Sequence, residues 1–257
     1  MRSYIILIGI IAALGAVGPS SFAQDGGFSW LDHQTEQRAK MIERTIAMKN
    51  GEVPQDAWNW SSWAQSASMA GREDLVEVAP IPGELQNRYD CQPEGDAAAM
   101  DQILTKAETH TIVIINEDHA EPRHRLFIRN LALQLRDRGF TRYAAETFST
   151  SIVDGTGYPR LGEGFYTTEP MLSRSVAALR QAGYKLVPYE AQIDQYDIND
   201  PDPRRQAAAR EEAQAQNLMD AVLNDEPEAK MIVHVGHGHA QELIISAPDF
   251  IPMMAAR

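Results

Sequence analysis

The chain has 257 residues, 44% of them hydrophobic, and a formal net charge of −13 at neutral pH. This length accommodates one domain of ordinary size with an extension. The acidity disfavours nucleic acid and anionic membrane surfaces as partners. Cys91 is the only cysteine, which excludes an intramolecular disulfide and a cysteine-rich zinc site.

The N-terminus has the three-part composition of a secretory signal peptide. Arg2 precedes an apolar run from Tyr4 to Val17, and small residues follow up to Ala23. We therefore predict a signal peptide over residues 1–23, cleaved after Ala23, and a periplasmic or secreted protein. The apolar run is short for a membrane span, so we expect no stable membrane insertion once the signal is removed.

Residues 24–90 are predicted to form a helical N-terminal extension. Helical patterns cover residues 35–51 and 53–71, and a connector rich in proline and glycine covers 79–90. All four tryptophans lie in this region: Trp30, Trp58, Trp60 and Trp63. We expect them to pack against the main domain rather than grip a ligand. A partner-binding surface on this extension is a further, non-catalytic hypothesis.

Residues 91–257 alternate between strand and helix patterns. Such alternation predicts an α/β fold with a mainly parallel sheet flanked by helices. Helices are expected at 96–110, 121–139, 168–183 and 202–225, and strands at 111–116, 142–147, 184–190 and 230–235. The glycine-rich stretch 149–168 has no clear periodicity and is a candidate lid or substrate loop.

Acids and imidazoles follow the predicted strands. Because ligands bind at the carboxyl ends of parallel strands, these side chains are expected to converge on one pocket. They are Glu117, His119, His124 and Arg125 after the first strand, Glu146 after the second, Glu190 after the third, and His237 and His239 after the fourth. His234 lies within the last strand and is expected to be buried behind the site.

Two chemistries fit these residues. In the first, His119, Glu146 and His239, with His237 as a further candidate, bind a divalent metal (zinc, manganese, cobalt or iron) that activates water. In the second, His119 or His239 removes a proton from water without a metal, and Glu146 orients the imidazole or stabilises its cation. Arg125 is then expected to bind an anionic substrate group or the developing oxyanion.

The sequence lacks the motifs of three common kinds of site. The stretch after the first strand, NEDHAEP, has no glycine, which argues against a dinucleotide-binding domain. There is no Gly-x-Ser-x-Gly motif of the serine hydrolases, and Glu117-x-His119 is not the His-Glu-x-x-His motif of zincins.

Three segments resemble the motifs of one superfamily, the erythromycin esterase, ChaN and TraB/Tiki group. They are INEDHAEPRHR, YAAETF and VHVGHGHAQE, and the similarity extends over roughly residues 95–250. The resemblance implies functional positions at Glu117, His119, Glu146 and His239. Glu190, Arg125 and His124 are weaker candidates for substrate binding.

The resemblance also implies what such a protein does. Members of the group hydrolyse esters or, with a metal, peptide bonds, and ChaN-like members bind haem in iron uptake. We therefore expect an exported, metal-assisted hydrolase acting on a small molecule or a peptide, with periplasmic haem binding as the alternative. Two features depart from the family pattern: Asn116 stands where glycine is usual, and the chain stops soon after the last motif, as if trimmed at its C-terminus.

Overall fold

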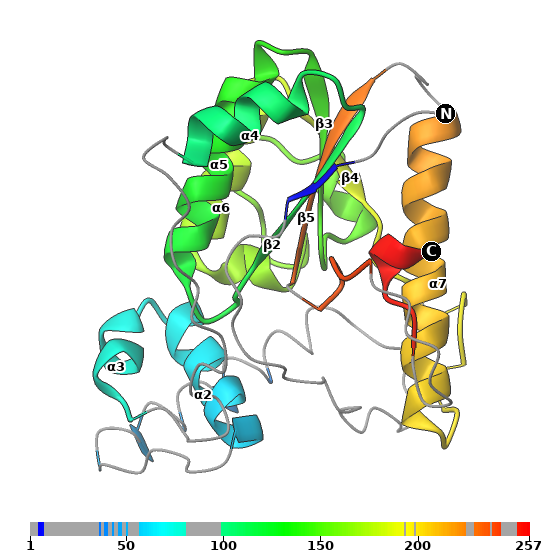
Figure 1. Ribbon diagram of the computed structural model, residues 1–257. Coiled ribbons are helices and arrows are strands. Elements are labelled where there is room, and N and C mark those ends of the chain that lie inside the picture. Colours follow the sequence, from blue (N-terminus) through cyan, green and yellow to red (C-terminus); the bar gives the residue numbers. More distant parts are fainter. Residues whose placement is uncertain are drawn as a thin grey trace.

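The computed structural model describes most of the predicted α/β domain and part of the extension (Figure 1). The described residues are 57–80, 99–192, 194–197, 199–224, 229–236, 238–242 and 251–257, together with 5–7 and isolated positions between 36 and 50. The predictions made for Trp30, Cys91, His237 and most of the helix 35–51 lie outside the described residues.

The predicted parallel α/β sheet is confirmed. Its strands run in the order β1-β2-β5-β3-β4 and every neighbouring pair is parallel. Their bounds are Ile5–Leu7 for β1, Ile112–Glu117 for β2, Phe140–Ala145 for β3, Lys185–Pro188 for β4 and Lys230–Gly236 for β5. The short β1 falls inside the predicted signal peptide and pairs with the outer edge of β2.

The last strand in the chain lies in the middle of the sheet. β5 pairs with β2 on one side and with β3 on the other. Glu117 at the end of β2 is level with Gly236 at the end of β5, and Ala145 at the end of β3 is level with His234. The carboxyl ends of three strands that are distant in sequence therefore lie side by side.

Helices cover both faces of the sheet (Figure 1). The larger core joins one face to α4 (Ala99–Ala107), α5 (Pro122–Arg136) and α6 (Pro170–Gln181), through residues such as Leu131 and Val176. The smaller core joins the other face to α7 (Pro203–Asn224), through residues such as Leu218. Burial on both faces explains why the strands are continuous apolar runs rather than alternating ones.

The predicted helix ends agree with the structure because local signals specify them. Pro122 and Pro170 occupy the first turns of α5 and α6, and the Glu169 side chain accepts hydrogen bonds from the second and third backbone amides of α6. Gly139 (φ 85°) and Gly183 (φ 79°) follow these two helices in the left-handed conformation.

The described part of the extension is a helix pair, α2 (Ala57–Met69) and α3 (Glu73–Val78), at one end of the layered domain (Figure 1). α3 was not predicted. Trp63 lies in a small apolar cluster of its own with Ala64, Ala67 and Val76, next to Ala120 of the main domain. None of the helices in the described residues has the length and hydropathy of a membrane span.

The stretch 149–168 folds back over the α6 side of the sheet. It contains two short 3₁₀ helices, η2 (Thr150–Ile152) and η3 (Tyr166–Thr168). Ile152 anchors the first in the larger core, whereas Tyr158 between them is 64% exposed. A third 3₁₀ helix, η4 (Met254–Ala256), packs against α7.

Candidate functional site

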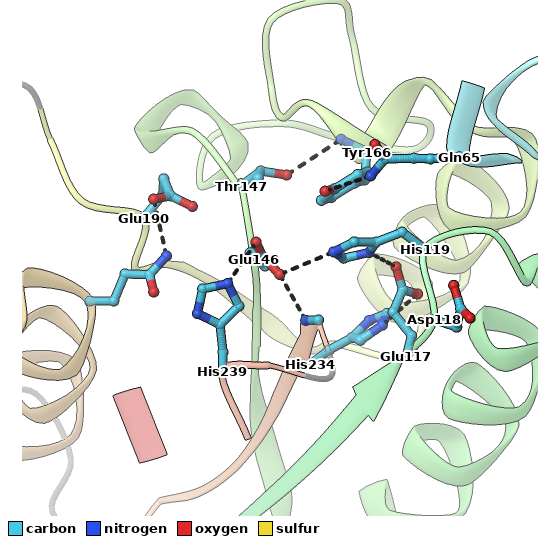
Figure 2. Close-up of polar contacts among 12 residues, drawn as sticks. Gln65, Glu117, Asp118, His119, Glu146, Thr147, Tyr166, Glu190, His234 and His239 are labelled. Carbon is cyan, nitrogen blue, oxygen red and sulfur yellow. Dashed lines mark hydrogen bonds and ion pairs between the residues drawn. The ribbon is translucent and has the colours of Figure 1, made fainter. Parts of the chain in front are cut away.

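Glu146 is the point at which the predicted residues meet (Figure 2). Its Oε2 atom lies 3.6 Å from Nε2 of His119, and its Oε1 atom lies 3.3 Å from Nε2 of His239. The backbone N–H of Gly236 donates a 2.7 Å hydrogen bond to the same Oε2 atom. Segments more than a hundred residues apart in the sequence therefore converge at the ends of β2, β3 and β5.

Glu117 is a buried carboxylate that organises one side of the site. Nε and Nη2 of Arg125 donate to it at 2.9 and 2.7 Å, and the imidazoles of His119 and His234 each lie 2.8 Å from one of its oxygens. Burial alone would raise the pKa of Glu117, but Arg125 and His234, with hydrogen bonds from both imidazoles, hold it well below its ordinary value.

His119 is fixed in one tautomer by this arrangement. An ionised carboxylate only accepts hydrogen bonds, so Nδ1, which faces Glu117, carries the proton. Nε2 is therefore the nitrogen that can accept a proton, and it points toward Glu146. The Tyr166 ring stacks on the imidazole with centroids 4.3 Å apart.

His234 lies behind the reactive groups, as expected. It is 3% exposed and bridges Glu117 through Nε2 and the Tyr143 hydroxyl through Nδ1, the latter at 2.7 Å. Successive side chains of β5 point to opposite faces of the sheet, so His234 lies on the same face as Ile232.

His239 lies between two carboxylates, Glu146 and Glu211, which favour its cationic form. Its Nδ1 lies 2.7 Å from Oε1 of Glu211, whose other oxygen accepts a 2.7 Å hydrogen bond from the Met254 amide. Burial by itself would lower the pKa of His239, but Glu146 and Glu211 outweigh it and raise the pKa to about 10. In turn, although burial would raise the pKa of Glu146, the cationic His239 holds it well below its ordinary value.

Arg210 of α7 is a site residue that the sequence did not reveal by itself. Its guanidinium lies 3.4 Å from both Glu146 and His239. Glu190 accepts from its Nε and Nη2 at 2.9 and 2.8 Å, and Gln214 also donates to Glu190. The polar residues 210, 214 and 217 recur at helical spacing on α7, and this stripe is the signal that could have indicated them.

Tyr166 and Gln65 were also not predicted. Tyr166 lies in the expected lid stretch, but nothing in the sequence distinguishes it from its neighbours. Gln65 of α2 donates a 2.9 Å hydrogen bond to the Tyr166 hydroxyl (Figure 2). The N-terminal extension thus reaches the site.

The backbone beside Glu146 is strained. Thr147 has φ 64°, and among the described residues no other non-glycine residue has a positive φ. This conformation is costly for a β-branched residue and is found at functional sites. Asn116, by contrast, lies in β2 and pairs with Val235, so it needs no special backbone geometry.

The predicted substrate-binding residues lie apart from the open side of the site. Arg125 is 1% exposed, and its Nη1 atom lies 2.9 Å from Glu169, so its charge is used between two glutamates. Glu190 holds Arg210. His124 accepts a 3.0 Å hydrogen bond from the Asp118 amide and stabilises the turn before α5.

A water-sized cavity borders His119 and Glu146. The space that the centre of a water molecule can occupy is about 10 Å³, and the walls include His119, Glu146 and Tyr166. This volume corresponds to about one water molecule. The side chains of His119 (21% exposed) and Arg210 (26% exposed) are partly accessible to solvent.

Three of the four predicted metal ligands, His119, Glu146 and His239, are described, whereas His237 lies outside the described residues. Among the described residues, no group of three histidine, cysteine or acidic side chains has the spacing to hold an ion. The contact of Nδ1 of His119 with Glu117 leaves Nε2 available to a metal. The Arg210 guanidinium, however, lies 3.4 Å from both Glu146 and His239, where its charge would repel a dication bound to those ligands.

Comparisons with known proteins give two solved structures of low similarity. No family model and no curated protein matches the chain. The structure of the type III effector HopBA1 is 17% identical, with a TM-score of 0.35 over 55% of this chain and 72% of that one. RRSP, a MARTX toxin effector domain from Vibrio vulnificus CMCP6, is 15% identical, with a TM-score of 0.42 over 86% of this chain and 42% of that one. This chain thus spans less than half the length of the RRSP structure.

Proposed function

We propose that the protein is a hydrolase in which His119 removes a proton from water. The observation that carries this proposal is the contact between Nδ1 of His119 and Glu117, which leaves Nε2 as a proton acceptor beside Glu146 and a water-sized cavity. The relation to the erythromycin esterase, ChaN and TraB/Tiki group is part of the same proposal and rests on the motifs at Glu117, Glu146 and His239.

The proposed reaction uses charges that are already in place. Water between His119 and Glu146 loses a proton to Nε2 of His119, and the resulting hydroxide adds to the carbonyl carbon of an ester or amide. The cations of His239 and Arg210 stabilise the oxyanion. The proton held by His119 or His239 passes to the leaving group as the carbon–oxygen or carbon–nitrogen bond breaks.

The first test is loss of turnover in His119→Gln with the fold retained. We expect hydrolysis of a panel of ester and peptide substrates to fall at least about 100-fold, as is usual when a general base is removed. His110→Gln is the matched control, because His110 is a partly exposed histidine just beyond α4 whose Nδ1 contacts the Lys106 carbonyl. Equal activity in wild type and His119→Gln would contradict the proposal.

The metal-assisted form of the reaction stays a prediction, and we favour the metal-free form because of the position of Arg210. The measurement is elemental analysis of the purified protein together with turnover before and after chelation. The metal-free form predicts unchanged turnover in chelator. Stoichiometric metal with chelator-sensitive turnover would restore the metal-assisted form.

Haem binding has less support from the contacts. An axial histidine needs a ring nitrogen that is open to iron, whereas both ring nitrogens of His119, His234 and His239 lie within 3.6 Å of carboxylate or hydroxyl oxygens. Titration with haemin, followed in the visible spectrum, tests this alternative. A Soret shift that is lost in His239→Ala would favour it over hydrolysis.

Export is proposed from the N-terminal sequence alone. Expression of the full chain in a bacterium with a periplasm is expected to give a periplasmic protein that begins at Gln24, as read by N-terminal sequencing. A cytoplasmic protein that retains residues 1–23 would contradict it.

A further inference from the structure

The imidazole of His119 has one in-plane hydrogen bond, a longer contact of 3.6 Å from Nε2 to Oε2 of Glu146, and one face contact. The in-plane anchor is the hydrogen bond from Nδ1 to Glu117, at 2.8 Å. A single hydrogen bond of this kind leaves the ring free to tilt about the line that joins the two atoms. The face contact is the Tyr166 ring, inclined by 23° to the imidazole, and this contact fixes the tilt.

Tyr166 is in turn held from the N-terminal extension. Its ring lies in an apolar cluster with Met69 of α2 and Leu172 of α6. Apolar packing is not directional and does not by itself fix the inclination of the ring. Arg125 lies over the ring at 5.5 Å and Phe165 packs edge-on against it, and the hydrogen bond from Gln65 to the hydroxyl adds a directional constraint at the far tip of the ring.

We propose that Gln65 is a positioning residue that acts on His119 through Tyr166, so that helix α2 of the N-terminal extension completes the hydrolytic site. This inference rests on the proposed function of His119. It gives the extension a role in orienting His119. The two earlier hypotheses for the extension, packing of its tryptophans and binding of a partner, do not require such a role.

Three variants separate the hydrogen bond from the ring stack. Gln65→Leu and Tyr166→Phe each remove the hydrogen bond and keep the stacked ring, whereas Tyr166→Leu removes the ring. Because the first two break the same contact, the double variant is expected to lose no more than either single variant. The expected loss is about 3- to 10-fold in kcat, as for one buried neutral hydrogen bond, with KM unchanged. Tyr166→Leu, which also removes the ring, is expected to show a larger loss in kcat.

The decisive readout does not depend on turnover. A tyrosine ring stacked on an imidazole shifts the imidazole proton resonances of His119 upfield, and the difference between wild type and His119→Gln identifies these resonances by NMR. We expect them to move downfield in Gln65→Leu and Tyr166→Phe, part of the way to their position in Tyr166→Leu. Asp74→Asn is the control, because Asp74 pairs with Arg72 within the extension.

The outcomes are distinct. Movement of the resonances in both hydrogen-bond variants, together with non-additive losses in kcat, supports the inference. Unmoved resonances in Gln65→Leu overturn it, whatever happens to turnover, and so does an equal movement in Asp74→Asn. If the wild type hydrolyses none of the substrates, the proposed function fails, but the resonances still decide whether α2 orients His119.

Discussion

At the scale of single residues, the site depends on close approaches that leave no room for side-chain atoms. Gly236 is the clearest case, because its backbone N–H donates to Glu146 while His119 lies against its Cα. A Cβ atom at this position would lie 2.6 Å from Nε2 of His119 and 3.0 Å from Oε2 of Glu146. These contacts are far shorter than packing allows, so one of the two side chains would have to move.

Gly236→Ala is therefore expected to reduce hydrolysis about 100-fold, the order of loss produced by displacing a catalytic group by about 1 Å. Steady-state kinetics measure this loss. Gly238→Ala is the matched control, since nothing lies within 4 Å of a Cβ atom there. Equal activities of the two variants would show that His119 and Glu146 need not hold their positions.

Arg125 gives a second prediction at this scale, in stability. Arg125→Met leaves Glu117 and Glu169 as buried charges without their common cation, which is expected to lower the free energy of unfolding by about 3–5 kcal/mol. Urea denaturation measures this change in the free energy of unfolding. Arg123→Met on the same helix is expected to be close to wild type, because the Arg123 side chain is 70% exposed.

At the scale of elements, helix α7 contributes to the site as well as to the core. Its apolar residues pack on the sheet, while Arg210, Glu211 and Gln214 face the strand ends. Glu190, which follows β4, fixes Arg210 through two hydrogen bonds. Glu190, placed by the end of β4, therefore sets the direction in which the Arg210 cation of α7 points into the site.

Glu190→Gln is expected to lower kcat by about 10- to 100-fold, because a charged hydrogen-bonded partner of Arg210 is lost and the guanidinium is no longer held toward Glu146. Kinetics at saturating substrate measure the change. Glu212→Gln is a control on the exposed face of α7, where Glu212 pairs with Arg257. A wild-type rate in Glu190→Gln would remove Arg210 from the proposed site.

At the scale of the whole molecule, the buried charges make stability depend on pH in two opposite ways. The pKa values of Glu117 and Glu146 are held below the ordinary value of 4.5, so their contribution is present above that pH and is lost as the pH falls. The pKa of His239 is raised from 6.5 to about 10, so its contribution is fully present below 6.5 and is lost as the pH rises through about 10.

The free energy of unfolding is therefore expected to be greatest between pH 4.5 and pH 6.5, with an acid limb and an alkaline limb. Urea denaturation over a range of pH gives this profile. His239→Gln is expected to flatten the alkaline limb, because the group that loses its proton there is gone. An unchanged alkaline limb in this variant would show that His239 is not the buried cation.

The sequence by itself determined the class of fold and the ends of most elements, because both follow from local chemistry. Continuous β-branched runs specify buried parallel strands, and proline at helix starts and glycine at helix ends mark the boundaries. Motif order also indicated Glu117, His119, Glu146 and His239. The strand predicted at 142–147 begins earlier, at Phe140, and ends at Ala145, just before the strained Thr147.

Only the tertiary structure decided which partner each charged group has. The insertion of β5 between β2 and β3 is a long-range pairing, and it brings Nε2 of both His119 and His239 to Glu146, while their Nδ1 atoms face Glu117 and Glu211. Arg210 and Gln65 come from helices whose faces are chosen by packing, so their contacts depend on where whole elements lie. Local propensity carries no information about distances between elements. The sequence could therefore indicate which residue types form the site, but not which of them contact one another.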